Sequence, residues 1–477
     1  MFSSRVIPNM PLLGLSEDEQ QLIKTLQSKA LLDRSDMELS EAYYLGCQVV
    51  QNLRIAVPPE VEQAIRTIVG WGALAVDPYV ERHAIDCFRL PDGTDADDYL
   101  TSIANANGLD AELPVAFTDV LSMGRTYWMV GSSPDGGAPR ITAESPLNTS
   151  VLWDLSGRVA RAAISEYRDE QNTLRGVLMV PHQTILLAQN DKGEWEISGR
   201  DMHDFGFVPI IRQANRVRTS NRAGRSAITE ALRSAIDSTC RTLLGLEVAR
   251  EIYSAPRMIL AGASEKDFVG SDGKPRKAWD TYISRVLGLE RDEDGNVPEL
   301  KQLTVYDPST FTKLVDNAAA RAASEVLAPP QDIGLYTDGN PISAEALNTS
   351  ESRRNRRARS QQREAGVPLG EVMKLAVRFD NKGVLPDKYR SIAVDWFDVE
   401  EPNIVGISDA ITKQITAEAI PATSDVTLKK LGWSAVERKR LEQDRKSERG
   451  ANVLKMIANN GQPPAAEAPA NGNPTGL

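Results

Sequence analysis

The sequence predicts an α+β protein that is mainly helical. Apolar residues recur at helical spacing before about residue 115 and again in long stripes after about residue 225. Between these regions the period shortens toward two, and clusters of turn-forming residues separate the apolar runs. Because these runs follow one another without intervening helical patterns, we expect an antiparallel meander and not a parallel nucleotide-binding sheet.

Composition and charge exclude several classes of protein. The 477 residues include 55 Lys and Arg against 66 Asp and Glu, a formal net charge of −11, whereas a broad nucleic-acid-binding face shows the opposite balance. Cys47, Cys87 and Cys240 lie far apart, which argues against a disulfide scaffold or a cysteine zinc site. No signal-peptide core and no run of about 18 apolar residues is present, so we expect a soluble protein made inside the cell.

Three helices are expected in the first third of the chain. Ser16 precedes three acidic residues, which is the pattern of an N-cap with acids in the first helical turn. Pro58-Pro59 predicts the start of a second helix. A third helix is expected from Asp97 to Asn107, ended by Gly108.

A first long helix is expected after the meander. Ser226 is the predicted cap, the apolar stripe runs to about Tyr253, and Pro256 stops the helix. The segment 257–306 then predicts a compact α/β insert with a short strand near each end.

A second long helix is expected after the insert. Asp307 is the predicted N-cap and Pro308 the first helical residue. Pro329-Pro330 cannot continue a helix, so this one is expected to end near Ala328. Several small residues on it permit the close approach of another helix: Ala318, Ala319, Ala320, Ala322 and Ala323.

The last third begins with a loop over 331–342 and a third long helix over 343–379 capped by Ser343. Gly366 and Pro368 are expected to kink or interrupt that helix. Segment 380–402 is expected to be extended, and two helices are expected at about 403–418 and 424–458. The remainder, 459–477, has the composition of a disordered tail.

No catalytic, cofactor-binding or metal-binding residue can be placed from the sequence. His83, His182 and His203 fall in no metal-ligand or triad pattern. The run 270–274 (Gly-Ser-Asp-Gly-Lys) lacks the spacing of a phosphate loop and opens no helix. The acids of segment 95–98 are more typical of a solvated face than of a cation site. We therefore expect a protein that is not an enzyme.

The third long helix carries six arginines within eleven residues. Such a run is either a nucleic-acid-binding patch or a set of partners for carboxylates of a neighbouring subunit. We favour intersubunit salt bridges through five of these residues: Arg353, Arg354, Arg356, Arg357 and Arg359. The first two long helices offer acids that could receive them: Glu230, Asp237, Glu247, Glu251, Asp316 and Glu325.

Two long helices that bracket a compact α/β insert, followed by a Pro/Gly loop and a third long helix, form an order that resembles the portal proteins of tailed bacteriophages. The phrases around the first long helix also resemble those of portals from phages of actinobacteria and other Gram-positive hosts. They are Gly224-Arg225-Ser226-Ala227-Ile228-Thr229 before the helix and Ala255-Pro256-Arg257 after it. The resemblance covers about residues 15–450.

The resemblance implies a homo-oligomeric ring, usually a dodecamer, at one capsid vertex of the virion, assembled in the cytoplasm of the host. Double-stranded DNA would pass through its channel non-specifically during packaging and ejection. The implied partners are the large terminase, a head–tail adaptor, and the major capsid and scaffolding proteins, with no cofactor and no membrane. The implied segments are a wing (1–225), stem helices (226–255 and 308–328), a clip (256–307), a tunnel loop (331–342), a long wing helix (343–379), a wing strand return (380–402), crown helices (403–458) and a tail (459–477).

The same resemblance implies two sets of site residues. The tunnel loop would face DNA through Gln331, Asp332, Tyr336, Asp338 and Asn340, with a generic surface loop as the alternative. The clip would contact the motor or the adaptor through Glu290, Arg291, Asp292, Glu293 and Asp294, although these residues could equally form a solvated hairpin. Twelve copies at −11 each carry −132 formal charges, and a wall of that sign does not grip the phosphate backbone.

Two other classes remain as alternatives. A phage enzyme that processes DNA, such as a packaging ATPase or a nuclease, requires a phosphate loop or clustered metal-binding carboxylates. A capsid shell protein favours flat lattice packing, whereas paired long helices favour a closed ring. If the alanine face packs in the ring, the substitution Ala319→Arg is expected to block assembly.

Overall fold

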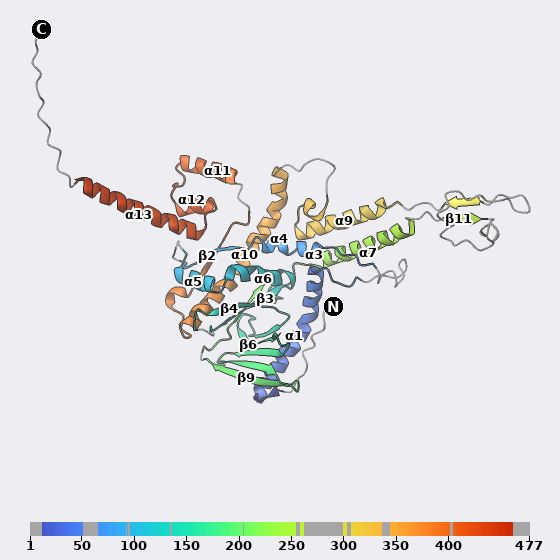
Figure 1. Cartoon of the computed structure of the whole chain (residues 1–477), viewed down its shortest axis with the longest axis horizontal. Coiled ribbons are helices and arrows are strands. Elements are labelled where there is room, and N and C mark those ends of the chain that lie inside the picture. Colours follow the sequence, from blue (N-terminus) through green and yellow to red (C-terminus); the bar gives the residue numbers. More distant parts are fainter. Residues whose placement is uncertain are drawn as a thin grey trace, which may run out of the picture. The chain divides into compact units, whose positions relative to one another are not determined.

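The computed structural model describes residues 12–50, 65–91, 93, 96–133, 136–203, 205–253, 258–261, 299–302, 307–335, 344–400 and 404–460 (Figure 1). The chain divides into two compact units. The first unit comprises residues 1–41, 75–227 and 352–477, and the second comprises residues 42–74 and 228–351. Helices and sheets are both present, and the predicted α+β class is confirmed.

A six-stranded sheet lies in the first unit. Its order is β1-β9-β8-β7-β6-β5, and each of β5 to β8 pairs antiparallel with the next strand in sequence, which confirms the predicted meander. At one edge β1 joins β9 in parallel. The strands are β1 (Leu12–Leu13), β5 (Thr149–Trp153), β6 (Ala160–Arg168), β7 (Leu174–Val180), β8 (Gln183–Gln189) and β9 (Trp195–Met202).

Different elements cover the two faces of this sheet. Neighbouring residues of a strand point to opposite faces, so Ile164 and Ala163 on β6 belong to separate cores. Ile164 shares a core with Ile23 of the helix α1 (Glu17–Tyr44). Ala163 shares a core with Ile210 of a second sheet, ordered β10-β3-β4. The strands of that sheet are β3 (Arg125–Gly131), β4 (Arg140–Glu144) and β10 (Ile210–Ala214). The six-stranded sheet is therefore sandwiched between α1 and the three-stranded sheet.

A third core of the first unit forms around the long helix α10 (Ala344–Asp380). It includes apolar residues of α5 (Asp98–Ala106), of α6 (Leu109–Ser122) and of the antiparallel pair β2 (Ile85–Arg89) and β13 (Ala393–Trp396). The strand β13 lies in the segment that was expected to be extended.

The predicted interruption of the third long helix at Gly366 and Pro368 is wrong, because α10 continues through both as one helix of 37 residues. A proline inside a helix costs about 3 kcal/mol. Just after it, Leu369, Val372 and Met373 are almost completely buried. Each such side chain contributes about 1.5–3 kcal/mol, so their burial outweighs the cost of the proline.

The predicted helix starts near the N-terminus are confirmed where they are described. Ser16 and Glu19 form a capping box at α1, in which the Ser16 amide donates to Glu19 Oε2 (2.9 Å) and the Glu19 amide donates to Ser16 Oγ (3.3 Å). Asp97 caps α5 by accepting hydrogen bonds from the amides of Tyr99 and Leu100. The helix expected to begin at Pro58-Pro59 lies outside the described residues.

The first long helix, α7 (Glu230–Tyr253), begins four residues later than predicted, because Ser226 is not its cap. The Ser226 hydroxyl instead donates to the carbonyl of Ser122 (2.5 Å). Just before Ser226, the backbone of Gly224 (φ 83°) packs directly against that of Gly124. A Cβ on Gly224 would lie 2.4 Å from the Gly124 carbonyl oxygen. The hydroxyl of Thr229 accepts from the Leu232 amide (3.3 Å) and takes the capping role.

The second long helix, α9 (Ser309–Val326), follows the prediction closely. The Asp307 carboxylate accepts from the Ser309 amide (2.9 Å) at its start. At its end Leu327 adopts a left-handed conformation (φ 58°) just before the two prolines. Between the long helices, β11 (Met258–Ala261) and β12 (Glu299–Gln302) pair antiparallel, which fits the two short strands expected there.

The segment 424–458 is divided, and the prediction of one helix there is wrong. After α11 (Ile404–Thr416) the chain forms α12 (Asp425–Lys430) and a separate α13 (Ala435–Asn460). Gly432 has φ 87° at the break, and Ser434 with Glu437 forms a new capping box. The remaining short elements are α3 (Trp71–Leu74), α4 (Asp77–Val80), η2 (Pro330–Ile333) and η3 (Asp387–Tyr389).

One partly buried acid of the fold gives a test of stability against pH. Burial raises the pKa of the Asp119 carboxyl on α6 to about 6, and the charge of Glu41 adds to this although a hydrogen bond with Ser145 opposes it. The folded state thus binds this proton more tightly than the unfolded chain, whose Asp pKa is about 4. The stability present below pH 4 is therefore lost as the pH rises from about 4 to about 6.

We expect Asp119→Asn to raise the free energy of unfolding at pH 7 by up to about 3 kcal/mol, because the neutral amide avoids the buried charge. Urea unfolding between pH 4.5 and 7.5 measures the effect. Asp191→Asn, in an exposed turn, is the matched control and should leave the profile unchanged. Identical pH profiles for Asp119→Asn and the unsubstituted protein would contradict the role of burial.

Candidate functional site

The helices α7 and α9 of the second unit run side by side (Figure 1). The hydroxyl of Thr229, at the start of α7, donates to Glu325 Oε1 near the end of α9 (2.7 Å). Farther along, a Cβ on Gly245 of α7 would lie 3.2 Å from the ring of Phe311 at the start of α9. The helices are therefore antiparallel, and small residues let them approach closely.

The predicted alanine face of α9 is buried within the subunit. Ala318, Ala319, Ala322 and Ala323 are all buried, whereas Ala320 is exposed. The expectation that Ala319→Arg specifically tests ring packing is therefore corrected. An arginine at a site that is 3% exposed in the single chain would disturb the fold of the subunit before it reached a neighbour.

Two residues that are far from α7 in the sequence make contact with this helix. The Tyr43 hydroxyl donates to Asp237 Oδ2 (2.9 Å), and the Arg233 guanidinium lies 5.5 Å from the centroid of the Tyr43 ring. Burial, followed by this contact with Asp237, raises the pKa of Tyr43 above its usual range. Thr67 adds a hydrogen bond to the carbonyl of Cys240 (2.9 Å). Sequence reasoning missed these contacts, because nothing near residue 43 or 67 points to α7.

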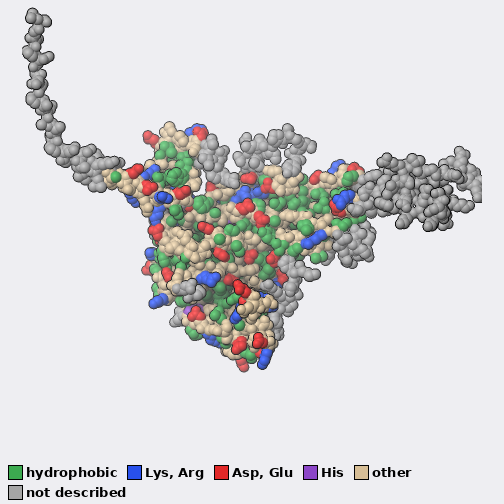
Figure 2. Space-filling model, in the orientation of Figure 1, with side chains coloured by type: hydrophobic (Ala, Val, Ile, Leu, Met, Phe, Trp, Pro, Cys, Tyr) green, Lys and Arg blue, Asp and Glu red, His purple; other side chains and the backbone are tan. Residues whose placement is uncertain are grey.

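The charge of the paired helices is nearly balanced. The α7 sequence holds four acids and three bases, and the α9 sequence holds two of each, so the pair carries a net charge of −1. Acidic and basic side chains are interspersed over this region in Figure 2. The acidic excess of the chain therefore does not reside on these two helices.

Four of the six acids that were considered as partners for the arginine run are engaged inside the second unit. Asp237 accepts from Tyr43, and Glu325 accepts from Thr229. The other two pair along their own helix, Glu230 with Arg233 (4.0 Å) and Glu247 with Arg250 (2.8 Å).

The arginine-bearing part of α10 lies in the first unit, and its five predicted site residues are not equivalent. Arg357 donates to Asn215 Oδ1 (2.9 Å) and lies 3.9 Å from Glu364. Arg359 pairs with Asp398 (3.0 Å) and Glu400 (2.9 Å). Arg354 is 3% exposed, whereas Arg353 and Arg356 are exposed. Arg353 and Arg356 are therefore the best placed of the five for contact with another subunit.

The predicted DNA-facing loop begins with a turn of regular helix and not with irregular coil. Pro330–Ile333 forms one turn of 3-10 helix, η2, so Gln331 and Asp332 sit on a defined turn directly after α9. Asp332 is exposed, and its amide donates to the carbonyl of Pro329 (3.0 Å). Tyr336, Asp338 and Asn340 lie outside the described residues, as do the clip residues Glu290, Arg291, Asp292, Glu293 and Asp294.

The described residues lack two kinds of arrangement. They contain no group of three or more His, Cys, Asp or Glu that could hold a metal ion, and no helix among them is long and apolar enough to span a bilayer. His83 is buried, and desolvation lowers its pKa to about 4. The run 270–274 and Asp95 lie outside the described residues.

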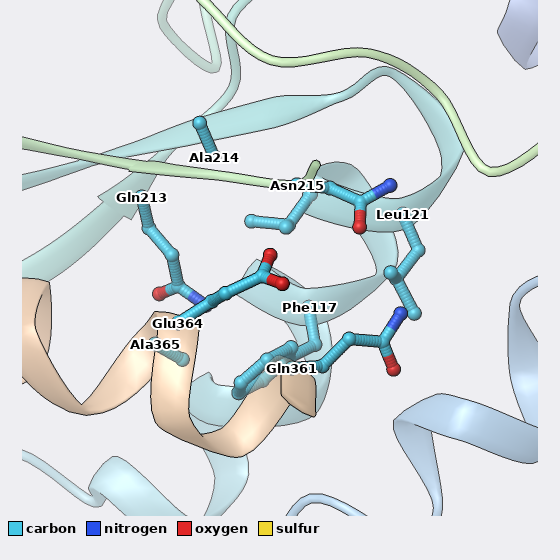
Figure 3. A pocket seen from close by; sticks show the side chains of 9 residues that line it. Phe117, Leu121, Gln213, Ala214, Asn215, Gln361, Glu364 and Ala365 are labelled. Carbon is cyan, nitrogen blue, oxygen red and sulfur yellow. The ribbon is translucent and has the colours of Figure 1, made fainter. Parts of the chain in front are cut away.

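A pocket between α6, β10 and α10 is too small for a nucleotide or a metabolite. Its volume is about 10 Å³, roughly that of one water molecule. Gln213 and Gln361 line it together with Phe117, Leu121 and Glu364 (Figure 3). The Gln213 amide oxygen accepts from the Trp128 indole (2.7 Å), so this pocket is part of the core.

Comparison with known proteins shows extended similarity to phage portal proteins. The family described as "Phage portal protein, SPP1 Gp6-like" matches residues 23–450. The portal protein of Mycobacterium phage L5 is 30% identical over 416 residues, which are 84% of this chain and 84% of that protein. The portal protein of Mycobacterium phage D29 is 29% identical over 418 residues, covering 86% and 84%.

Among solved structures, the virion of a native gene transfer agent particle holds a chain that aligns with a TM-score of 0.46 and 15% identity, covering 84% of this chain and 99% of that one. The family assignment rests on the sequence match, which covers most of the chain, including α7, α9 and the sequence before and after them. The chain belongs to the SPP1 Gp6-like family of phage portal proteins, a structural family of the phage virion.

Proposed function

We propose that twelve copies of this chain form a closed ring at one vertex of the capsid and that double-stranded DNA enters and leaves through its channel. The observation that carries the proposal is the family match over residues 23–450. The antiparallel pair α7–α9 supports it, because two long helices joined by the Thr229–Glu325 hydrogen bond make a rigid two-helix unit. In a ring, the α7–α9 pairs of neighbouring subunits can stand side by side and line a channel.

We assign the family's parts to this chain as the resemblance implies. The α7–α9 pair is the stem, segment 256–307 is the clip, and 331–342 is the tunnel loop. The first unit supplies the wing (1–225) apart from residues 42–74, which belong to the second unit, and it also supplies the wing strand return (380–402) and the crown (403–458). The long wing helix (343–379) begins in the second unit and continues into the first.

The electrostatics of the stem suit a conduit. Tight binding of duplex DNA depends on Lys and Arg contacts that release counterions. A stem with a net charge of −1 per subunit offers little such binding, so a moving strand would not stall on it. The tunnel-loop residues Asp332, Tyr336 and Asp338 suit transient contact for the same reason.

The partners follow from this placement. The clip, with Glu290 to Asp294, would meet the large terminase during packaging and the head–tail adaptor afterwards. The wing would contact the major capsid and scaffolding proteins. Assembly would take place in the host cytoplasm, and the finished ring would remain in the virion.

The ring itself can be tested with purified protein. We expect negative-stain images to show rings with a central hole wide enough for duplex DNA, and mass photometry to give twelve times the 52.2 kDa subunit mass. A monodisperse monomer at high concentration would contradict the ring. Turnover of ATP by the purified rings would contradict the purely structural role.

The intersubunit arginines can be tested by charge reversal. Arg353→Glu combined with Arg356→Glu is expected to abolish rings while leaving a folded subunit, because both side chains are exposed. Size-exclusion chromatography and circular dichroism measure the two properties. Arg359→Gln is the control, because that residue pairs with Asp398 and Glu400 of its own chain and should affect stability more than assembly. Intact rings from the double variant would argue against these salt bridges.

The tunnel loop can be tested by adding positive charge. Asp332→Lys with Asp338→Lys adds four charges per subunit, and we expect rings of this variant to retain duplex DNA at low salt and release it as salt is raised. The same change on the wing, Asp110→Lys with Asp191→Lys, is the matched control. Filter binding across a salt series measures retention, and equal retention by the two variants would count against a DNA-facing loop.

A further inference from the structure

A short turn between β5 and β6, residues 154–159, is held unusually firmly. The Asp154 carboxylate accepts from the amides of Arg158 (2.9 Å) and Val159 (3.0 Å) and from the hydroxyl of Ser156 (2.6 Å). The Asp154 amide donates to the carbonyl of Val159, and the Gly157 amide donates to that of Asp154, each at 2.9 Å. A turn held by this many bonds has little conformational entropy left to lose when it binds a partner.

This rigid turn presents apolar side chains to solvent. Leu155 at its tip is fully exposed, and Val159 is 60% exposed. Single exposed apolar residues are common on protein surfaces. Here, however, the apolar tip is fixed in place, the Asp154 carboxylate is taken up by hydrogen bonds within the turn, and the other charged residues around the tip are basic.

The surroundings of the turn are basic. Arg212 donates to the Gly157 carbonyl (2.9 Å) and stacks over Trp153 at 4.3 Å. Arg222 packs against Gly157, where a Cβ would lie 3.0 Å from its Cδ. Arg158 in the turn itself adds a further exposed cation. An apolar tip among arginines fits a partner surface that is both apolar and acidic.

The outer face of α1 has that chemistry. Leu32 is 83% exposed and Leu39 is 45% exposed, and the exposed Asp36 lies between them at helical spacing on the same face. The α1 sequence as a whole contains seven acids and three bases, a net charge of −4. The inner face of the same helix is buried against the six-stranded sheet through Ile23 and Leu26.

The two surfaces are connected to opposite faces of the six-stranded sheet. The turn is tied to β10, on the side of the six-stranded sheet that the β10-β3-β4 sheet covers. The exposed face of α1 looks away from the other side of that sheet. Two complementary surfaces on opposite sides of one subunit give a head-to-tail contact, which closes into a ring when the rotation allows.

We propose that the 154–159 turn of one subunit docks on the outer face of α1 of the next copy, with Leu155 as its apolar anchor and Arg158 and Arg222 facing the acids of α1. This inference rests on the proposed ring and names the surfaces that join its subunits. The partner that binds the turn is a second copy of this chain, because both complementary surfaces occur on the same subunit.

The test uses one variant on each side of the contact. Leu155→Asp and Leu32→Asp each place a carboxylate in the proposed interface, and each is expected to abolish rings and leave a folded monomer. Val384→Asp, at another exposed apolar site (67%), is the matched control and should still form rings. Mass photometry gives the oligomeric state, and circular dichroism confirms the fold.

A mixture of the two variants tests the head-to-tail arrangement. The intact turn of the Leu32→Asp chain can dock on the intact α1 of the Leu155→Asp chain, but both outer ends of that pair are blocked. We therefore expect a 1:1 mixture to give dimers and no rings. Rings from either variant, or a mixture that remains monomeric, would overturn the docking surface while the ring of the unsubstituted protein stood. An unsubstituted protein that stayed monomeric would overturn both.

Discussion

The close antiparallel contact between α7 and α9 is the constraint on which the second unit depends. Small residues set the spacing, because Gly245 leaves room for Phe311 and the alanines of α9 are buried without bulky side chains. The hydrogen bond from Thr229 to Glu325 ties the start of one helix to the end of the other. Because the helices are antiparallel, the end of α7 and the start of α9 lie close together, which brings together the two ends of the segment between them. Larger residues along this contact would push the two helices apart.

Local signals in the sequence predicted elements well where the decisive interaction is itself local. Caps, turns and proline stops act within a few residues, so the start of α1 and the end of α9 could be read directly. The errors arose where distant packing or a weak local signal decided the outcome. Burial of Leu369 and Met373 carries α10 through Pro368, and a carbonyl of α6 takes the hydroxyl of Ser226. Gly432 and the Ser434–Glu437 box were local signals for the break before α13, and the strong helical periodicity on both sides obscured them.

The candidate site was predictable only in part, for a related reason. The sequence shows that arginines gather on one helix, but it does not show which of them find a partner in the same chain. Arg357 reaches Asn215, and Arg359 reaches Asp398, through contacts that only the folded first unit creates. Exposure separates Arg353 and Arg356 from these residues, and exposure follows from tertiary packing. The contact of Tyr43 with Asp237 was likewise invisible in the sequence, since the two residues are 194 positions apart.

The distribution of charge changes the physical interpretation of the acidic composition. A net charge of −11 suggests a channel wall that repels DNA, yet α7 and α9 together carry only −1, whereas α1 alone carries −4. A nearly neutral wall neither binds nor strongly repels a polyanion, and long-range repulsion would itself resist the entry of DNA. In the proposed contact between subunits, the acids of α1 and the basic residues around the 154–159 turn would contribute to register and direction. In the proposed ring, the surplus of acids on α1 would help to orient the subunits, while the α7–α9 pair stays nearly neutral.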